Sequence, residues 1–204
     1  ASARLLVDGA AGTGKTFLFE AVLALARSRG HVVVACAWSG LAATLLPGAR
    51  TCHSVFGLPV PLPAEGRLMN VGPRTGRAEL LRAASVIVWD EMFMCPARVL
   101  DDVDAGLRDL CEVDAPFAGK LVVLGGDARQ TLPVMPHASR VEQTDASARC
   151  AAVLTRFPTD RFMRPTHLDA ALFEAFAGCA KGVPAKRDVK YLGGATNPDT
   201  GADE

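Results

Sequence analysis

The feature that most constrains this chain is a glycine-rich loop that fits the pattern Gly, four residues, Gly-Lys-Thr. A short apolar run at 5–7 precedes the loop and predicts a strand, and 17–29 predicts a helix that Gly30 ends. A strand, a glycine-rich turn and a helix in this order place backbone N–H groups and a helix N-terminus around a phosphate. We therefore predict that the chain binds a nucleoside triphosphate through Gly9, Ala10, Ala11, Gly12, Thr13, Gly14, Lys15 and Thr16.

The chemistry expected of such a loop extends to a pair of carboxylates further along the chain. Lys15 would reach the β- and γ-phosphates, and the Thr16 hydroxyl would bind Mg²⁺. Asp90 and Glu91 directly follow the apolar run 86–88, and ligands bind at the carboxyl ends of parallel strands. Asp90 is thus placed to hold Mg²⁺ and Glu91 to polarise an attacking water. A small-molecule kinase, the weakest alternative, needs no glutamate for that step.

The order of the predicted elements indicates an α/β fold with a parallel sheet and helices on both faces. A proline- and glycine-rich stretch at 58–76 predicts a long irregular insertion. Further strands are predicted over 31–37, 85–89 and 121–124, and helices over 41–46, 78–84, 96–112, 146–154 and 168–181. Within the helix over 96–112, we interpret the cluster Asp101, Asp102 and Asp104 as a solvated face, and we expect Trp38 and Trp89 to pack at strand ends.

Composition narrows the class of protein. The 204 residues predict one domain over 1–192 and a flexible tail over 193–204. Formal net charge is zero, with 22 basic and 22 acidic residues, so a nucleic-acid partner gains no support from bulk charge. No apolar run is long enough to cross a membrane. The six cysteines form no Cys-x-x-Cys pair and indicate reduced thiols in an intracellular protein. We expect a nuclear location if the source is eukaryotic.

A second polar segment follows the predicted strand at 121–124. Gln130, within 125–134, can hydrogen-bond a γ-phosphate through its amide. The spacing alone leaves open the alternative that this segment is a glycine-proline turn with an exposed polar tip.

Several segments in this order resemble the motor core of the superfamily-one DNA helicases of the petite-integration-frequency group, in particular the kind carried by Helitron transposons. The resemblance runs from 5 to about 182 and lies in 8–19 (DGAAGTGKTFLF), 39–58 (SGLAATLLPGARTCHSVFGL), 88–94 (VWDEMFM), 116–120 (PFAGK), 125–134 (GGDARQTLPV) and 163–164 (MR). It implies a P-loop NTPase with a RecA-like domain that binds ATP and Mg²⁺. It also implies contact with single-stranded DNA and hydrolysis coupled to 5′ to 3′ movement.

The resemblance also assigns residues. It implies the roles stated above for four residues: Lys15, Thr16, Asp90 and Glu91. It also implies that Gln130 senses the γ-phosphate and that Arg164 reaches the same phosphate. Small residues and hydroxyls suit phosphate contacts that read no base. The residues matched to the DNA-contacting motifs are Ser39, Gly40, Thr51, His53 and Ser54.

The chain departs from the family pattern in places. Ala118 replaces a glycine, Ala128 a phenylalanine and Phe162 an asparagine. The family's adenine-recognising glutamine motif would precede Ala1, and its second RecA-like domain would follow Glu204, so we expect a piece of a longer protein. A helicase motor domain is the favoured function, and a truncated or non-motor module that binds ATP and DNA is the alternative.

Overall fold

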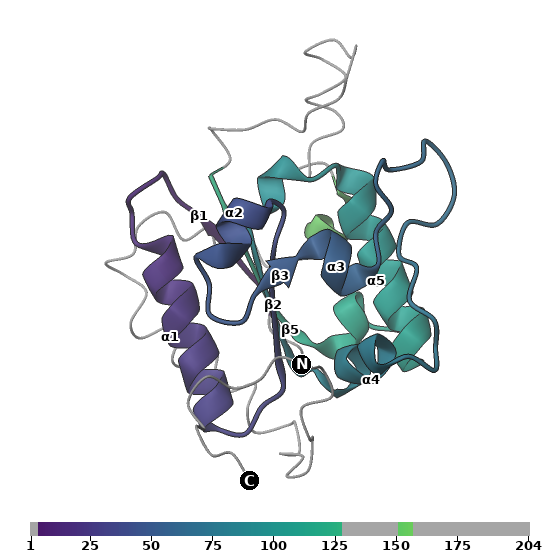
Figure 1. The fold of residues 1–204 in the computed structure, drawn as a ribbon, viewed down its shortest axis with the longest axis horizontal. Helices are drawn as coiled ribbons and strands as arrows, with labels where there is room; N and C mark the ends of the chain where they lie inside the picture. Colours follow the sequence, from purple (N-terminus) through teal and green to yellow (C-terminus); the bar gives the residue numbers. More distant parts are fainter. Residues whose placement is uncertain (1–3, 128–150, 157–204) are drawn as a thin grey trace, which may run out of the picture.

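The computed structural model describes residues 4–127 and 151–156, and Figure 1 shows their arrangement. A five-stranded sheet, in which every neighbouring pair is parallel, has the strand order β1-β5-β4-β2-β3. Its strands are β1 (Arg4–Asp8), β2 (Val33–Ala37), β3 (Arg50–Thr51), β4 (Val86–Asp90) and β5 (Leu121–Gly126). The predicted strands are confirmed. Strand β3 was not predicted, because two residues are too few to show the alternating pattern of a strand.

The helices lie on both faces of this sheet, as predicted. Helix α1 (Lys15–Ser28) covers one face, while α3 (Cys52–Phe56), α4 (Gly76–Ala83) and α5 (Ala97–Cys111) cover the other (Figure 1). The short α2 is Gly40–Thr44, and the 3-10 helices are η1 (Met92–Met94), η2 (Pro116–Gly119) and η4 (Ala152–Arg156). None of the helices in the described part of the chain is long and apolar enough to cross a membrane.

Strand β4 shows how the two layers are built, because successive side chains of a strand point to opposite faces. Val86 and Val88 pack in the cluster that contains α1 residues such as Phe19. Ile87 and Trp89 pack in the larger cluster beneath α3, α4 and α5. The strand is buried along its whole length, which places its carboxyl end, Asp90, at the rim of the core.

The insertion is irregular, as predicted, yet it is fastened to one stripe of α5. The Arg98 guanidinium donates to the carbonyls of Pro63, Ala64 and Gly66. One turn later, an Asp102 carboxylate oxygen accepts from the amides of Leu68 and Met69, at 2.9 and 2.6 Å. Buried backbone amides need such partners, so α5 supplies the hydrogen bonds that the loop cannot make for itself.

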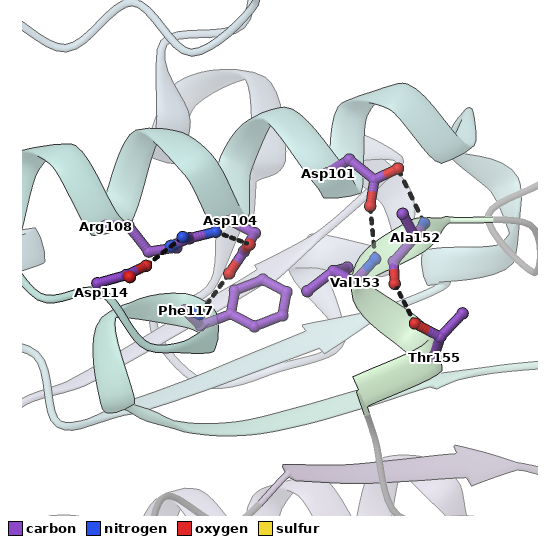
Figure 2. A network of polar contacts seen from close by, with 8 residues as sticks. All are labelled: Asp101, Asp104, Arg108, Asp114, Phe117, Ala152, Val153 and Thr155. Atoms are coloured by element: carbon purple, nitrogen blue, oxygen red, sulfur yellow. Dashed lines mark hydrogen bonds and ion pairs between the residues drawn. The ribbon is translucent and has the colours of Figure 1, made fainter.

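The prediction of a solvated acidic face on α5 is wrong. Besides Asp102, the buried Asp104 accepts from the Phe117 amide at 2.5 Å. Asp101 accepts from the amides of Ala152 and Val153, at 3.0 and 2.7 Å (Figure 2). Each carboxylate therefore binds backbone N–H groups of a different segment outside α5. The acidic residues of the sequence do not reveal this role.

The C-terminal elements are only partly described. The described end of the predicted helix over 146–154 is the 3-10 helix η4, whose first amides are those bound by Asp101. The predicted helix over 168–181 and the tail over 193–204 lie outside the described residues.

Candidate nucleotide and nucleic-acid site

The predicted phosphate loop connects β1 to α1 at the carboxyl edge of the sheet. The Gly9 amide donates to the Gly126 carbonyl at 3.1 Å and so ties the loop to β5. Gly12 and Gly14 have φ angles of +75° and +89°, a left-handed conformation that only glycine adopts freely. A Cβ on Gly9 would lie 2.7 Å from the Thr13 hydroxyl oxygen. The glycines of the motif are thus required by the local backbone.

Lys15, the first residue of α1, folds back over this loop. Its Nζ donates to the carbonyls of Gly9 and Ala10, at 2.6 and 3.0 Å. The Thr13 hydroxyl donates to the same Ala10 carbonyl at 2.8 Å and tightens the turn. The ammonium group is therefore held within the loop, where a bound phosphate would compete for its donors.

Asp90 ends β4 in a buried position, and its Oδ1 accepts a hydrogen bond from the Glu91 amide at 2.8 Å. Burial raises the pKa of Asp90, while that hydrogen bond and the charge of Lys15 offset part of the rise. The second carboxylate oxygen is not engaged by this hydrogen bond. An oxygen ligand of this kind suits Mg²⁺.

Glu91 has an unusual backbone. Its φ and ψ angles are 54° and 34°, a left-handed conformation that is costly for a residue with a side chain. Burial and then the charge of Asp90 raise the pKa of the Glu91 carboxyl, Lys15 opposes the rise, and Asp127 adds to it. Strain of this kind clusters at functional sites, and here it sits at the residue predicted to activate water.

The end of β5 completes this edge. A Cβ on Gly125 would lie 2.0 Å from the ring of Phe19 in α1, and one on Gly126 would lie 2.8 Å from the ring of Phe93 in η1. The two glycines therefore let β5 pass between those rings. Buried Asp127 follows, close enough to affect Glu91. The sequence analysis assigned no role to Asp127. The predicted site residues Gln130 and Arg164 lie outside the described residues.

The five residues matched to DNA-contacting motifs come from two neighbouring segments. Strands β2 and β3 are parallel partners, so the residues after them meet at one edge (Figure 1). The Ser39 hydroxyl oxygen caps α2 by accepting from the Ala42 amide, and the Thr51 hydroxyl oxygen caps α3 by accepting from Ser54. These two oxygens are therefore engaged locally, and each hydroxyl retains its proton as a donor. Gly40 and Ser54 are exposed.

Trp38 and His53 connect these two segments. Their ring centroids are 4.8 Å apart, with the planes inclined at 50°. Burial lowers the pKa of His53, so its ring is neutral at pH 7. The Trp38 amide also donates to the Asp90 carbonyl at 3.4 Å. A direct backbone contact therefore joins the candidate DNA-binding edge to the candidate Mg²⁺ ligand.

Comparison with known proteins identifies the family. The model of the PIF1-like helicase family matches residues 1–172. The chain belongs to the PIF1-like helicases. The α/β P-loop fold with a RecA-like parallel sheet, inferred from the sequence, is thereby confirmed.

Individual relatives give the same result. The chain is 32% identical over 131 residues to the ATP-dependent DNA helicase Pif1 of Psychrobacter sp. (strain PRwf-1), covering 64% of this chain and 20% of that protein. It is 29% identical over 130 residues to the human ATP-dependent DNA helicase PIF1, again covering 64% and 20%. The chain thus spans about a fifth of the length of these curated relatives.

Solved structures of PIF1-like helicases have the same fold. A crystal structure of the Pif1 helicase from Bacteroides, in complex with ADP-AlF3 and ssDNA, matches with a TM-score of 0.67 and 30% identity. That match covers 79% of this chain and 38% of the other. The Pif1 helicase from Candida albicans matches with a TM-score of 0.66 and 25% identity, covering 79% of this chain and 36% of that one.

Proposed function

We propose that this chain is the ATP-binding motor domain of an ATP-dependent DNA helicase, in which ATP hydrolysis drives 5′ to 3′ movement along single-stranded DNA. One observation carries the proposal: in a chain of the PIF1-like helicase family, Lys15, Asp90 and Glu91 meet at one edge of the sheet, beside the phosphate loop. This is the set of groups that phosphoryl transfer to water requires.

The division of labour follows from the positions of these groups. The loop amides and Lys15 bind the phosphates, and Glu91 orients and polarises the attacking water. Thr16, at the start of α1, and the second carboxylate oxygen of Asp90 are the hard oxygen ligands that Mg²⁺ prefers, so the residues present fit this ion. When bound, Mg²⁺ neutralises charge on the β- and γ-phosphates.

Other parts of the proposal depend on relatives. The Bacteroides Pif1 structure was solved with ADP-AlF3 and ssDNA, which supports ATP and single-stranded DNA as the ligands of this chain. Gln130 as the γ-phosphate sensor and Arg164 as a second phosphate contact belong to the same proposal, as does a second RecA-like domain in the whole protein. An intracellular location, nuclear in a eukaryotic source, is also part of the proposal.

Lys15→Ala tests the nucleotide site. The variant should lose ATP binding while its circular dichroism spectrum is unchanged, because within the described residues the hydrogen bonds of the Lys15 ammonium go to the loop carbonyls of Gly9 and Ala10. Undiminished ATP binding would exclude the phosphate-loop assignment. Arg27→Ala, at the far end of α1, is the matched control for the loss of a cation and should bind ATP normally.

The proposed motor function is tested by steady-state ATP hydrolysis and strand displacement on a 5′-tailed duplex. An arginine supplied by a partner domain can be worth about 10³–10⁵ in rate. We therefore expect residues 1–204 alone to bind ATP weakly, hydrolyse it very slowly, respond little to single-stranded DNA and unwind nothing. Robust unwinding by this piece would contradict the proposal that a second domain is needed. A longer chain with that domain and no ATP-driven movement would favour the non-motor alternative.

A further inference from the structure

The ring pair Trp38–His53 joins the two segments that carry the candidate DNA contacts. Trp38 directly precedes Ser39, the cap of α2, and His53 lies in the first turn of α3, which Thr51 caps. The ring centroids are 4.8 Å apart. Both side chains are partly exposed. The pair is therefore a partly exposed aromatic surface between the two segments.

Packing alone does not account for this position. Trp89 shows what a packed tryptophan looks like in this protein: it is fully buried and lies against Phe56, with ring centroids 5.3 Å apart. Trp38 directly follows β2, the neighbouring strand in the same sheet, but remains partly exposed. The prediction of packing therefore holds for Trp89 and describes only one side of Trp38.

The surroundings of the pair offer apolar surface for a base beside donors for a phosphate. The hydroxyl oxygens of Ser39 and Thr51 accept from backbone amides, and their O–H protons can still be donated to a phosphate oxygen. Next to them, Leu41 exposes 78% of its surface at the start of α2. The chain also has no net positive charge with which to hold a strand. This edge thus offers a nucleic acid apolar and aromatic surface beside two hydroxyl donors.

We propose that Trp38, supported from behind by His53, is a stacking platform for one base of the bound single strand. This inference rests on the proposed function of DNA binding and assigns a contact that the matched motif residues do not include. Every base has a π-face, so the platform confers affinity without sequence preference. The Trp38 backbone N–H donates to the Asp90 carbonyl, so the residue that carries the platform adjoins the strand end that carries the candidate Mg²⁺ ligand.

Binding of residues 1–204 to fluorescein-labelled oligothymidylate, measured by anisotropy, tests the platform. Trp38→Leu should weaken binding about tenfold, in line with the energy of one base stacked on an aromatic side chain. Trp38→Phe should keep most of the affinity. Phe17→Leu is the matched control, because Phe17 is an exposed ring, at 77% exposure, outside the platform. Circular dichroism establishes that each variant is folded.

An abasic oligonucleotide of the same length separates stacking from phosphate contacts. The unchanged protein should bind the abasic strand about tenfold more weakly than oligothymidylate, and Trp38→Leu should weaken abasic binding no further. The dependence of affinity on salt should be the same in both proteins, because no phosphate contact is lost. In addition, oligothymidylate should quench the tryptophan fluorescence of the unchanged protein but not that of Trp38→Phe, whose remaining tryptophan is buried Trp89.

The outcomes distinguish the two proposals. Equal affinity of the unchanged protein and Trp38→Leu for oligothymidylate would overturn the platform and leave DNA binding intact. The platform would also be overturned if Trp38→Leu weakened abasic binding as strongly as oligothymidylate binding. It would likewise be overturned if Phe17→Leu weakened oligothymidylate binding as much as Trp38→Leu does. No binding of either oligonucleotide by the unchanged protein would overturn the proposed DNA binding together with the platform.

Discussion

The Glu91 amide donates to the Asp90 carboxylate at 2.8 Å, so the two candidate catalytic carboxylates are adjacent yet held apart in orientation. The bond occupies one oxygen of Asp90, and the left-handed backbone of Glu91 turns its side chain out of the line of β4. Two neighbouring residues can thereby serve different partners, a cation and a water molecule. The first prediction separates these roles.

Glu91→Gln should retain Mg²⁺-ATP binding and lower the rate of hydrolysis by about 10² or more, because the amide keeps the shape of the side chain but cannot accept a proton. Nucleotide binding with and without Mg²⁺, measured beside single-turnover hydrolysis, checks this. Asp90→Asn is the comparison variant and should weaken only the Mg²⁺-dependent part of binding. Identical Mg²⁺ titrations of the two variants would contradict the division of roles.

The raised pKa of Glu91 also has a consequence for stability. Burial and the neighbouring Asp90 raise this pKa above its ordinary value of 4.5. Between pH 4.5 and the higher folded-state pKa, the folded protein binds more protons than the unfolded chain, so folding is weakened as the pH rises through that window. Glu91→Gln carries no such charge and should have the higher Tm at pH 7.

The Tm difference between Glu91→Gln and the unchanged protein should disappear below pH 4.5, where Glu91 is protonated in both states. Thermal unfolding at a series of pH values measures it. Gln has the same shape and the same left-handed backbone cost as Glu, so strain does not contribute to the difference. A Tm advantage that persisted unchanged at acidic pH would point to packing instead of charge.

The buried Asp104 should be important for stability. Asp104→Ala leaves the Phe117 amide without its acceptor, which costs about 1–3 kcal/mol of unfolding free energy. The matched control is Asp109→Ala on the same helix, whose pair with Arg67 is exposed and is worth less than about 1 kcal/mol. Urea unfolding of both variants provides the comparison. Equal losses would show that the α5 carboxylates are interchangeable surface charges.

These carboxylates illustrate where sequence reasoning reached its limit. Periodicity and apolar runs predicted the main strands, the helices α1, α4 and α5, and the phosphate loop, because each depends on local pattern. The partners of Asp101, Asp102 and Asp104 are backbone amides of segments distant in the chain, and no pattern of letters encodes them. The site followed the same rule: the ends of the predicted strands were placed correctly, but the ring contact between Trp38, after β2, and His53, in α3, was not predicted.

The buried thiols should be unreactive in the folded protein. Burial raises the pKa of Cys52 and of Cys95, and the thiolate is the reactive form. Brief treatment with iodoacetamide at pH 7.5 should therefore modify the partly exposed Cys111 and spare these two, as read from tryptic peptides by mass spectrometry. In denaturant all three should react. Rapid modification of Cys95 in the native protein would show that η1 opens readily.

Ala118 should carry a backbone penalty. Its φ and ψ angles are 53° and 35°, and a side chain in that left-handed region costs about 1–2 kcal/mol. Ala118→Gly removes the penalty but gives the unfolded chain more freedom, so it needs a control with the same entropic effect. Ala115→Gly, three residues earlier at φ −140°, is that control, because an ordinary extended residue gains nothing from glycine. We expect Ala118→Gly to be more stable than Ala115→Gly by about 1–2 kcal/mol in urea unfolding. Equal stabilities would mean that the turn relaxes around Ala118 without strain.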